Sequence, residues 1–236
     1  MNRRIFRCAA LTVALFLAAL VTRASGNVGF SGIAYGSSCL IGDSIGFGIL
    51  SSPTVTAAQT ILNIVDVAKG IYPARNAGIP GDTSVGGLSR FESDCLAFGP
   101  SQITIQFGTN DPGSSIAVGA IGTAGSYTDN IAKMIVKAQR TGARVTLWVP
   151  ILAQDPTLDA SIAPYRTAMR GLAATFGCDL FDTYADMAAL PGATQNSFFH
   201  EPPPTGQHLS AAGNAWGAGL VGTGAYANAF KSAVHP

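Results

Sequence analysis

Short apolar runs alternate along the chain with longer stretches whose apolar residues recur at helical spacing. The short runs predict buried strands at residues 38–41, 72–76, 103–107, 144–149 and 178–181. The longer stretches predict helices at residues 56–70, 84–98, 126–141 and 164–176, and a last helix after residue 208. Strands that alternate with helices are typical of a parallel sheet covered on both faces. The pattern therefore predicts an α/β fold with five strands.

The first 24 residues depart from this pattern and have the features of an export signal. A start with three arginines precedes an apolar run, residues 8–21, which is too short to span a bilayer comfortably. Small residues around Ala24 suit cleavage by a signal peptidase. We therefore expect a signal peptide at residues 1–24 and a single mature domain at residues 25–236, secreted or periplasmic. An uncleaved membrane anchor is the alternative.

Charge narrows the range of partners. Removal of the first 24 residues takes away four arginines and no acidic residue, which leaves 10 basic residues against 13 acidic ones. A slightly acidic domain lacks the basic surface that nucleic acids and anionic membranes require. We expect neither as a partner and no stable membrane anchor, and the oligomeric state stays open.

Three cysteines remain after cleavage, Cys39, Cys95 and Cys178. Export permits a disulfide, but an odd number leaves at least one thiol unpaired. Each cysteine lies in or beside an apolar segment, so we expect buried, reduced thiols. No Cys/His spacing fits a metal site, and we expect neither a metal nor an organic cofactor.

The first predicted strand is followed by Gly42-Asp43-Ser44. A serine at the carboxyl end of a strand lies at the edge where open α/β sheets bind their ligands. Such a serine becomes a nucleophile only if a base takes its proton and hydrogen-bond donors receive the oxyanion. Asp43 itself is expected to stabilise the turn, since its side chain should point away from that of Ser44.

Three further blocks could supply a base and donors, and they occur in order along the chain. They are Arg75-Asn-Ala-Gly-Ile-Pro-Gly-Asp-Thr83, Gln106-Phe-Gly-Thr-Asn-Asp-Pro112 and Gln207-His-Leu-Ser-Ala-Ala-Gly-Asn-Ala-Trp216. Together with Cys39–Gly48 they resemble the SGNH (GDSL) hydrolase family of serine esterases and lipases. The resemblance implies a flavodoxin-like three-layer α/β/α sandwich with a five-stranded parallel sheet.

The same resemblance assigns roles to individual residues. Ser44 is the nucleophile, and its backbone N–H is also a donor to the oxyanion. Gly81 supplies a second donor, with Gly78 as the alternative in the same loop, and the Asn110 side chain supplies the third unless it only forms an Asx turn. His208 is the general base.

One position departs from the family pattern. An aspartate usually stands three residues before the histidine, where this chain has Thr205. Three groups could orient His208 instead: a backbone carbonyl near Pro204, the Glu201 carboxylate, or the Thr205 hydroxyl. We favour the carbonyl, because prolines fix the backbone well.

These assignments predict a secreted serine esterase that hydrolyses carboxylic (O-acyl) esters through an acyl-enzyme on Ser44. The substrate would be a small-molecule or polysaccharide-linked ester, bound between residues 112–125 and 190–206. Two alternatives are an acyltransferase that acts on a sugar or peptidoglycan hydroxyl, and a catalytically degraded module that binds carbohydrate.

Overall fold

The computed structural model describes residues 37–48 and 74–222, and the structural statements below concern these residues. They contain a five-stranded sheet in the order β2-β1-β3-β4-β5, in which every pair of neighbouring strands is parallel. The strands are β1 (Ser38–Gly42), β2 (Ala74–Gly78), β3 (Gln102–Gln106), β4 (Arg144–Trp148) and β5 (Asp179–Phe181). The predicted α/β fold with five parallel strands is confirmed.

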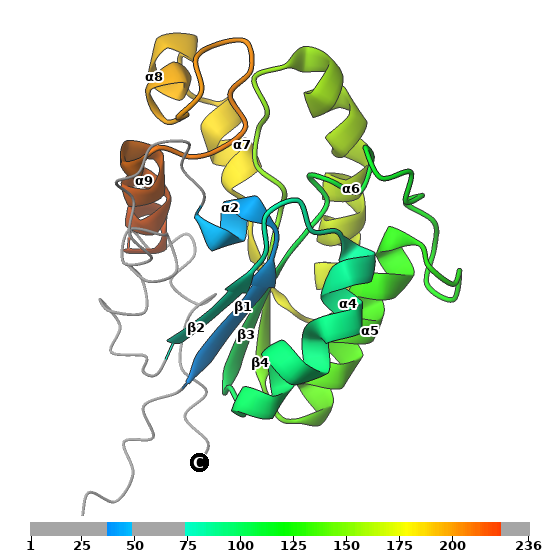
Figure 1. Ribbon diagram of the computed structural model, residues 1–236. Helices are drawn as coiled ribbons and strands as arrows, with labels where there is room; N and C mark the ends of the chain where they lie inside the picture. Colours follow the sequence, from blue (N-terminus) through cyan, green and yellow to red (C-terminus); the bar gives the residue numbers. More distant parts are fainter. Residues whose placement is uncertain (1–36, 49–73, 223–236) are drawn as a thin grey trace, which may run out of the picture. The chain divides into compact units, whose positions relative to one another are not determined.

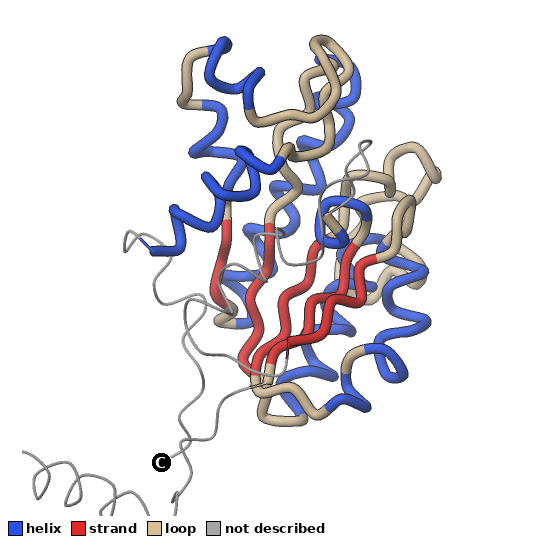
Figure 2. The backbone as a smooth tube through the Cα atoms, turned by 60° about the vertical axis from the view of Figure 1, so that its left-hand side comes forward, coloured by secondary structure: helices blue, strands red, loops and turns tan. Residues whose placement is uncertain are grey.

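Helices cover the sheet and occupy the connections between its strands (Figures 1 and 2). The longer ones are α4 (Ser84–Asp94), α5 (Tyr127–Arg140), α6 (Pro156–Phe176) and α9 (Ala211–Gly222). The shorter ones are α2 (Ser44–Phe47), the 3₁₀ turn η2 (Leu96–Phe98), α7 (Thr183–Ala188) and α8 (Gly192–Ser197). The helix predicted at residues 56–70 and the signal peptide predicted at residues 1–24 lie outside the described residues.

The start of α6 corrects the sequence analysis, which placed it at Pro164. The helix begins at Pro156, and Pro164 lies inside it. The Asp155 side chain accepts the backbone N–H groups of Thr157 and Leu158, each at 2.8 Å, and Pro156 occupies the first turn. A capping aspartate followed by proline is a strong start signal, and it prevails over the second proline.

Two apolar cores lie on opposite faces of the sheet. Cys39 and Ile41 of β1 contribute to the larger core, together with side chains of α4, α5 and α6. Figure 1 shows these three helices on one side of the sheet. Leu40, between them in sequence, belongs to the second core, which includes Met187 of α7 and Ala218 of α9. Alternate residues of one strand therefore face different cores, as in a three-layer sandwich.

The cysteines also correct the sequence analysis. Cys39 and Cys95 form a disulfide, with their Cα atoms 5.7 Å apart, instead of remaining reduced. Cys39 faces the larger core from β1, and Cys95 caps the end of α4 on the same side of the sheet. Cys178 is a free, half-buried thiol.

The register of the strands determines where the functional blocks meet. Gly42 of β1 pairs with Gly78 of β2 and with Gln106 of β3, so the three strands end side by side. The strand order reverses at β1, and open α/β sheets bind ligands at such a point. The segments that follow these strands, which carry Ser44, Gly81 and Asn110, therefore leave the sheet at one edge.

Candidate active site

The nucleophile candidate lies in a turn held from both sides. Asp43 is the N-cap of α2, and its side chain accepts the Ile45 backbone N–H at 2.8 Å. The buried Gln106 side chain reaches across from β3, and its Oε1 accepts the N–H groups of Asp43 at 3.2 Å and Gly46 at 3.1 Å. Ser44, the first residue of α2, is therefore fixed by hydrogen bonds to the residues around it.

Asp43 acts on this turn and does not contact the base. Its side chain is completely buried, and burial raises its pKa from 3.8 to about 7, with a smaller contribution from the negative charge of Asp111. Hydrogen bonds from Ile45 and Gln106 work in the opposite direction. The predicted turn-stabilising role of Asp43 agrees with its hydrogen bond to Ile45.

The base candidate is in position to take the proton of the nucleophile. His208 Nε2 lies 3.1 Å from Ser44 Oγ. On the other side of the ring, Nδ1 contacts the Glu201 carboxylate at hydrogen-bond distance. When Nδ1 carries the ring proton and donates a hydrogen bond to Glu201, the lone pair of Nε2 faces the serine hydroxyl. This is the tautomer that a general base requires.

Glu201 is thus the group at Nδ1, and our preference for a backbone carbonyl near Pro204 was wrong. The second carboxylate oxygen of Glu201 accepts the backbone N–H groups of His208 at 3.0 Å and Gln207 at 3.2 Å. Burial works to raise the pKa of Glu201, but the hydrogen bonds from His208 and Gln207 outweigh it, and the pKa lies below its usual value. The carboxylate is therefore charged at neutral pH.

A fold-back of the chain explains how Glu201 reaches the histidine. Phe199 and Leu209 form an antiparallel bridge, and the His200 N–H donates to the His208 carbonyl at 2.9 Å. Residues 199 and 209 therefore lie side by side, and the segment between them closes into a loop with Glu201 next to His208. We call residues 199–209 the base loop.

The remaining candidates near the base have other partners. The Thr205 hydroxyl donates to the Pro202 carbonyl at 2.9 Å and is exposed. His200 belongs to the bridge of the base loop, and His235 lies outside the described residues. A signal for Glu201 existed in the sequence, since two apolar residues, Phe199 and Leu209, enclose the prolines, but the irregular composition of that stretch concealed the pairing.

The two glycines considered as oxyanion donors, Gly78 at the end of β2 and Gly81 in the glycine loop that follows it, differ in their surroundings. The Gly78 N–H already donates to the Asn76 side chain at 2.9 Å, and a Cβ at Gly78 would come within 2.5 Å of the Phe47 backbone. Gly78 therefore serves the close approach of β2 to α2. Gly81 is exposed and has a φ of +76°, a conformation that favours glycine. Its donor role stays a prediction.

Asn110 follows β3, and its side chain has one hydrogen-bond partner among the described residues. Its Nδ2 donates to the backbone carbonyl of Asp82 at 2.9 Å, which orients the amide and leaves its second N–H for another acceptor. This contact joins the block that follows β3 to the glycine loop that follows β2. The role of Asn110 toward an oxyanion also stays a prediction.

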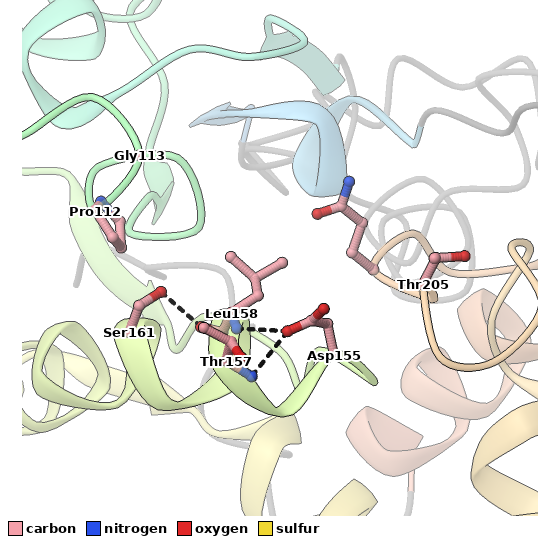
Figure 3. Close-up of a pocket in the computed structure, with 8 residues that line it drawn as sticks. Pro112, Gly113, Asp155, Thr157, Leu158, Ser161 and Thr205 are labelled. Carbon is pink, nitrogen blue, oxygen red and sulfur yellow. Dashed lines mark hydrogen bonds between the residues drawn. The ribbon is translucent and has the colours of Figure 1, made fainter.

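A cleft of about 540 Å³ lies between the loop that follows Asn110 and the base loop (Figure 3). It is lined by Pro112, Gly113, Asp155, Thr157, Leu158, Ser161, Thr205 and Gln207. Figure 3 shows Pro112 and Gly113 on one loop, Asp155 to Ser161 along the start of α6, and Thr205 on the base loop across from them. The sequence analysis identified the two loops and missed the contribution of α6, because it began that helix too late.

The described residues contain neither a cluster of metal ligands nor a membrane-spanning helix. Within residues 37–48 and 74–222, no three His, Cys, Asp or Glu side chains gather in a way that could hold a metal ion. No helix in the described part of the chain has the length and apolar character needed to cross a membrane.

Comparisons with known proteins agree with the geometry. Residues 40–216 match the protein-family model described as the GDSL-like Lipase/Acylhydrolase family. A lipase/acylhydrolase from Enterococcus faecalis is 25% identical, with a TM-score of 0.62 over 78% of this chain and 92% of that one. No curated protein sequence matches the chain.

Two solved acetylxylan esterases share the fold at lower identity. The first, described as an acetyl xylan esterase, is 22% identical, with a TM-score of 0.60 over 80% of this chain and 99% of that one. The second, from Geobacillus stearothermophilus, is 17% identical, with a TM-score of 0.59 over 79% of this chain and 92% of that one.

Proposed function

We propose that this chain, which belongs to the GDSL-like lipase/acylhydrolase family, hydrolyses carboxylic esters through an acyl-enzyme on Ser44. The observation that carries the proposal is the row formed by Ser44 Oγ, the His208 ring and the Glu201 carboxylate. A hydroxyl, an imidazole and a carboxylate in this order are the groups that nucleophilic acyl transfer requires. The resemblance to SGNH hydrolases inferred from the four sequence blocks is confirmed.

The reaction follows from the positions of these groups. His208 Nε2 takes the proton of Ser44 Oγ as the oxygen attacks the acyl carbon, and the charged Glu201 stabilises the imidazolium that forms. The tetrahedral intermediate then collapses, and His208 returns the proton to the alkoxide of the leaving alcohol. In the second half of the reaction His208 takes a proton from a water molecule that attacks the acyl carbon. The bond to Ser44 Oγ then breaks, His208 returns the proton to that oxygen, and the acid is released.

The negative charge on the carbonyl oxygen needs fixed donors during both steps. We assign this role to the backbone N–H groups of Ser44 and Gly81 and to the Asn110 side chain. The observations that support it are the positive φ of Gly81, the Gly78 N–H already in use, and the second N–H of the oriented Asn110 amide. Such donors act mainly on the transition state.

We propose that the alcohol portion of the substrate is polar, such as a sugar carrying acyl groups. The cleft at the base loop supports this, because Asp155, Thr157, Ser161, Thr205 and Gln207 bring carboxylate, hydroxyl and amide groups to a surface that is otherwise mostly apolar. The shared fold of the acetylxylan esterases is consistent with such a substrate. Transfer of the acyl group to a sugar hydroxyl, instead of to water, is the second candidate, supported by the same hydroxyl, amide and carboxylate groups.

The degraded binding module loses its main support. That alternative rested on Thr205 in place of the family's aspartate, and the structure supplies a carboxylate at Nδ1 from Glu201.

We also propose that the protein is exported after cleavage near Ala24. The Cys39–Cys95 disulfide supports this, since disulfides persist mainly in oxidising compartments. N-terminal sequencing of protein recovered outside the cytoplasm should start at Ser25 or within a few residues of it. Recovery only as a membrane-bound chain that starts at Met1 would overturn the proposal.

Release of the chromophore from a short-chain acyl nitrophenyl ester tests the esterase proposal. The wild-type protein should turn the ester over, and a fluorophosphonate probe should label it. Ser44→Ala should lose both signals, whereas Ser93→Ala, an exposed serine near the end of α4, should keep both. Equal turnover and labelling in Ser44→Ala would show that another residue is the nucleophile.

A further inference from the structure

Arg90 of α4 contacts two of the segments that form the active site. Its Nε donates to Asp82 Oδ2 at 2.8 Å, and Nη2 lies 2.7 Å from the same oxygen. Nη2 also donates to the Gly42 carbonyl at 3.1 Å, and Nη1 donates to the Ala77 carbonyl. Only 14% of the Arg90 side chain is exposed, so these contacts are largely shielded from water.

The partners of Arg90 stand next to the groups assigned to catalysis. Gly42 lies two residues before Ser44. Ala77 lies near the end of β2, and Asp82 directly follows Gly81 in the glycine loop after that strand. One guanidinium group therefore holds the ends of β1 and β2 and the loop that contains Gly81.

Asp82 extends this connection to Asn110. The side chain of Asp82 binds Arg90, and its other carboxylate oxygen accepts the Thr83 N–H at 2.8 Å. The backbone carbonyl of the same residue accepts the Asn110 amide at 2.9 Å. A residue held by its side chain presents its carbonyl in a fixed direction, and the direction of that carbonyl sets the orientation of the Asn110 amide.

The residue type suits this task. A guanidinium is planar and has five N–H donors in a fixed arrangement, so it can bind a carboxylate and two carbonyls at once. A lysine keeps the charge but has a single mobile ammonium, and it cannot reproduce these contacts. The charge is balanced by Asp82 and by Asp94, whose carboxylate lies 3.1 Å from Nη1.

We propose that Arg90 is a positioning residue that orients the Asn110 amide, through Asp82, toward the oxyanion. This inference rests on the proposed function, because it takes Asn110 as an oxyanion donor. It assigns Arg90 no contact with the substrate. Loss of Arg90 should therefore affect the transition state while leaving the binding of substrate nearly intact.

A double-mutant cycle on a short-chain acyl ester tests the link. Asn110→Ala should lower kcat by about 10²–10³. Arg90→Lys should lower kcat by about ten-fold, with KM changed by less than about two-fold. In the Asn110→Ala background, Arg90→Lys should cost less than about three-fold, because the donor that it positions is already absent. Asp82→Asn, which weakens the same connection, should behave like Arg90→Lys and gives a second variant should the first fail to fold.

Arg144→Lys is the matched control. Arg144 also forms a pair with an aspartate, Asp179, but at the beginning of β4, at the opposite edge of the sheet from the site. This variant should lower the melting temperature without changing kcat or KM.

The outcomes separate the two proposals. Equal losses from Arg90→Lys in the native and Asn110→Ala backgrounds would overturn the Arg90 link alone. A normal kcat in Asn110→Ala would overturn the donor role of Asn110 and the Arg90 proposal with it. Absence of turnover in the wild-type protein would overturn the proposed function itself.

Discussion

The Glu201 carboxylate binds His208 at two places, the imidazole ring and the backbone N–H. One carboxylate oxygen contacts ring Nδ1, and the other accepts the backbone N–H of His208 at 3.0 Å. The carboxylate therefore fixes both the tautomer of the ring and the position of the chain that carries it.

Glu201→Gln should lower kcat by about 10³–10⁴ with little change in KM, because an amide can present an N–H to the ring and favour the wrong tautomer. Steady-state kinetics with an unchanged melting temperature would establish this. Thr205→Ala is the control and should change kcat by less than about two-fold, since its hydroxyl binds only the Pro202 carbonyl among the described residues. A loss of less than about ten-fold in Glu201→Gln would return the orienting role to another group.

The buried Asp43 should make stability depend on pH. Its pKa is raised to about 7, above its value of 3.8 in an unfolded chain, so between these values the folded protein holds a proton that the unfolded chain has released. The charged carboxylate thus destabilises the fold above about pH 7, and this cost disappears as the pH falls toward the lower value.

Asp43→Asn removes this charge and keeps an N-cap residue. Melting temperatures between about pH 5.5 and pH 8.5 should fall less steeply in the variant, by a few degrees at the alkaline end. Parallel curves for wild type and variant would contradict the raised pKa.

Gly81 and Gly99 form a matched pair. Both have positive φ, +76° and +64°, and a Cβ at either position would meet no atom within 4 Å. Substitution of either glycine by alanine should therefore lower the free energy of unfolding by about 1–2 kcal/mol, because the backbone would be strained. Only Gly81→Ala should also lower kcat, because it shifts the N–H assigned to the oxyanion. An equal kcat in both variants would remove Gly81 from the site.

The disulfide should contribute stability without taking part in the reaction. Replacing Cys39 and Cys95 together by alanine should lower the free energy of unfolding by about 2–4 kcal/mol. At a temperature where the variant stays folded, kcat should remain within about two-fold of wild type. Cys178→Ala is the control, since burial raises the pKa of this thiol to about 12 and keeps it neutral. A large loss of kcat in the double variant would mean that the disulfide positions the nucleophile strand.

The cleft should determine which alcohol portion of an ester substrate the protein binds. Ser161→Phe at the start of α6 should raise KM for an acetylated sugar by about ten-fold and leave a small nitrophenyl ester unaffected. Thr175→Phe, near the other end of the same helix, is the control. Equal effects of Ser161→Phe on both esters would place the alcohol elsewhere.

Local patterns were sufficient for the sheet and for the place of Ser44 at its edge. Apolar runs that end in Gly42 or Gln106 mark strand ends, and parallel strands bring those ends to one edge, so the position of Ser44 followed from the sequence. The choice of Ser44 as nucleophile and His208 as base came from the resemblance of the four blocks to the SGNH hydrolase family.

The sequence patterns did not predict the contacts between segments that are distant along the chain. Glu201 meets His208 only because the base loop folds back on the bridge between Phe199 and Leu209, and no periodic pattern records that fold-back. The disulfide joins residues 56 positions apart, and each cysteine by itself resembles an ordinary core residue. The contribution of α6 to the cleft was missed because Asp155 starts the helix before the proline that seemed to mark its beginning.

In the base loop, the acid stands at a different sequence position from that of the family pattern, but its carboxylate still lies next to the histidine. In the family pattern the acid precedes the histidine by three residues, and here it precedes it by seven, yet a carboxylate lies at Nδ1 in this chain. Both positions belong to one loop. The fold-back of the base loop, and not a fixed spacing along the chain, therefore brings the carboxylate to the histidine.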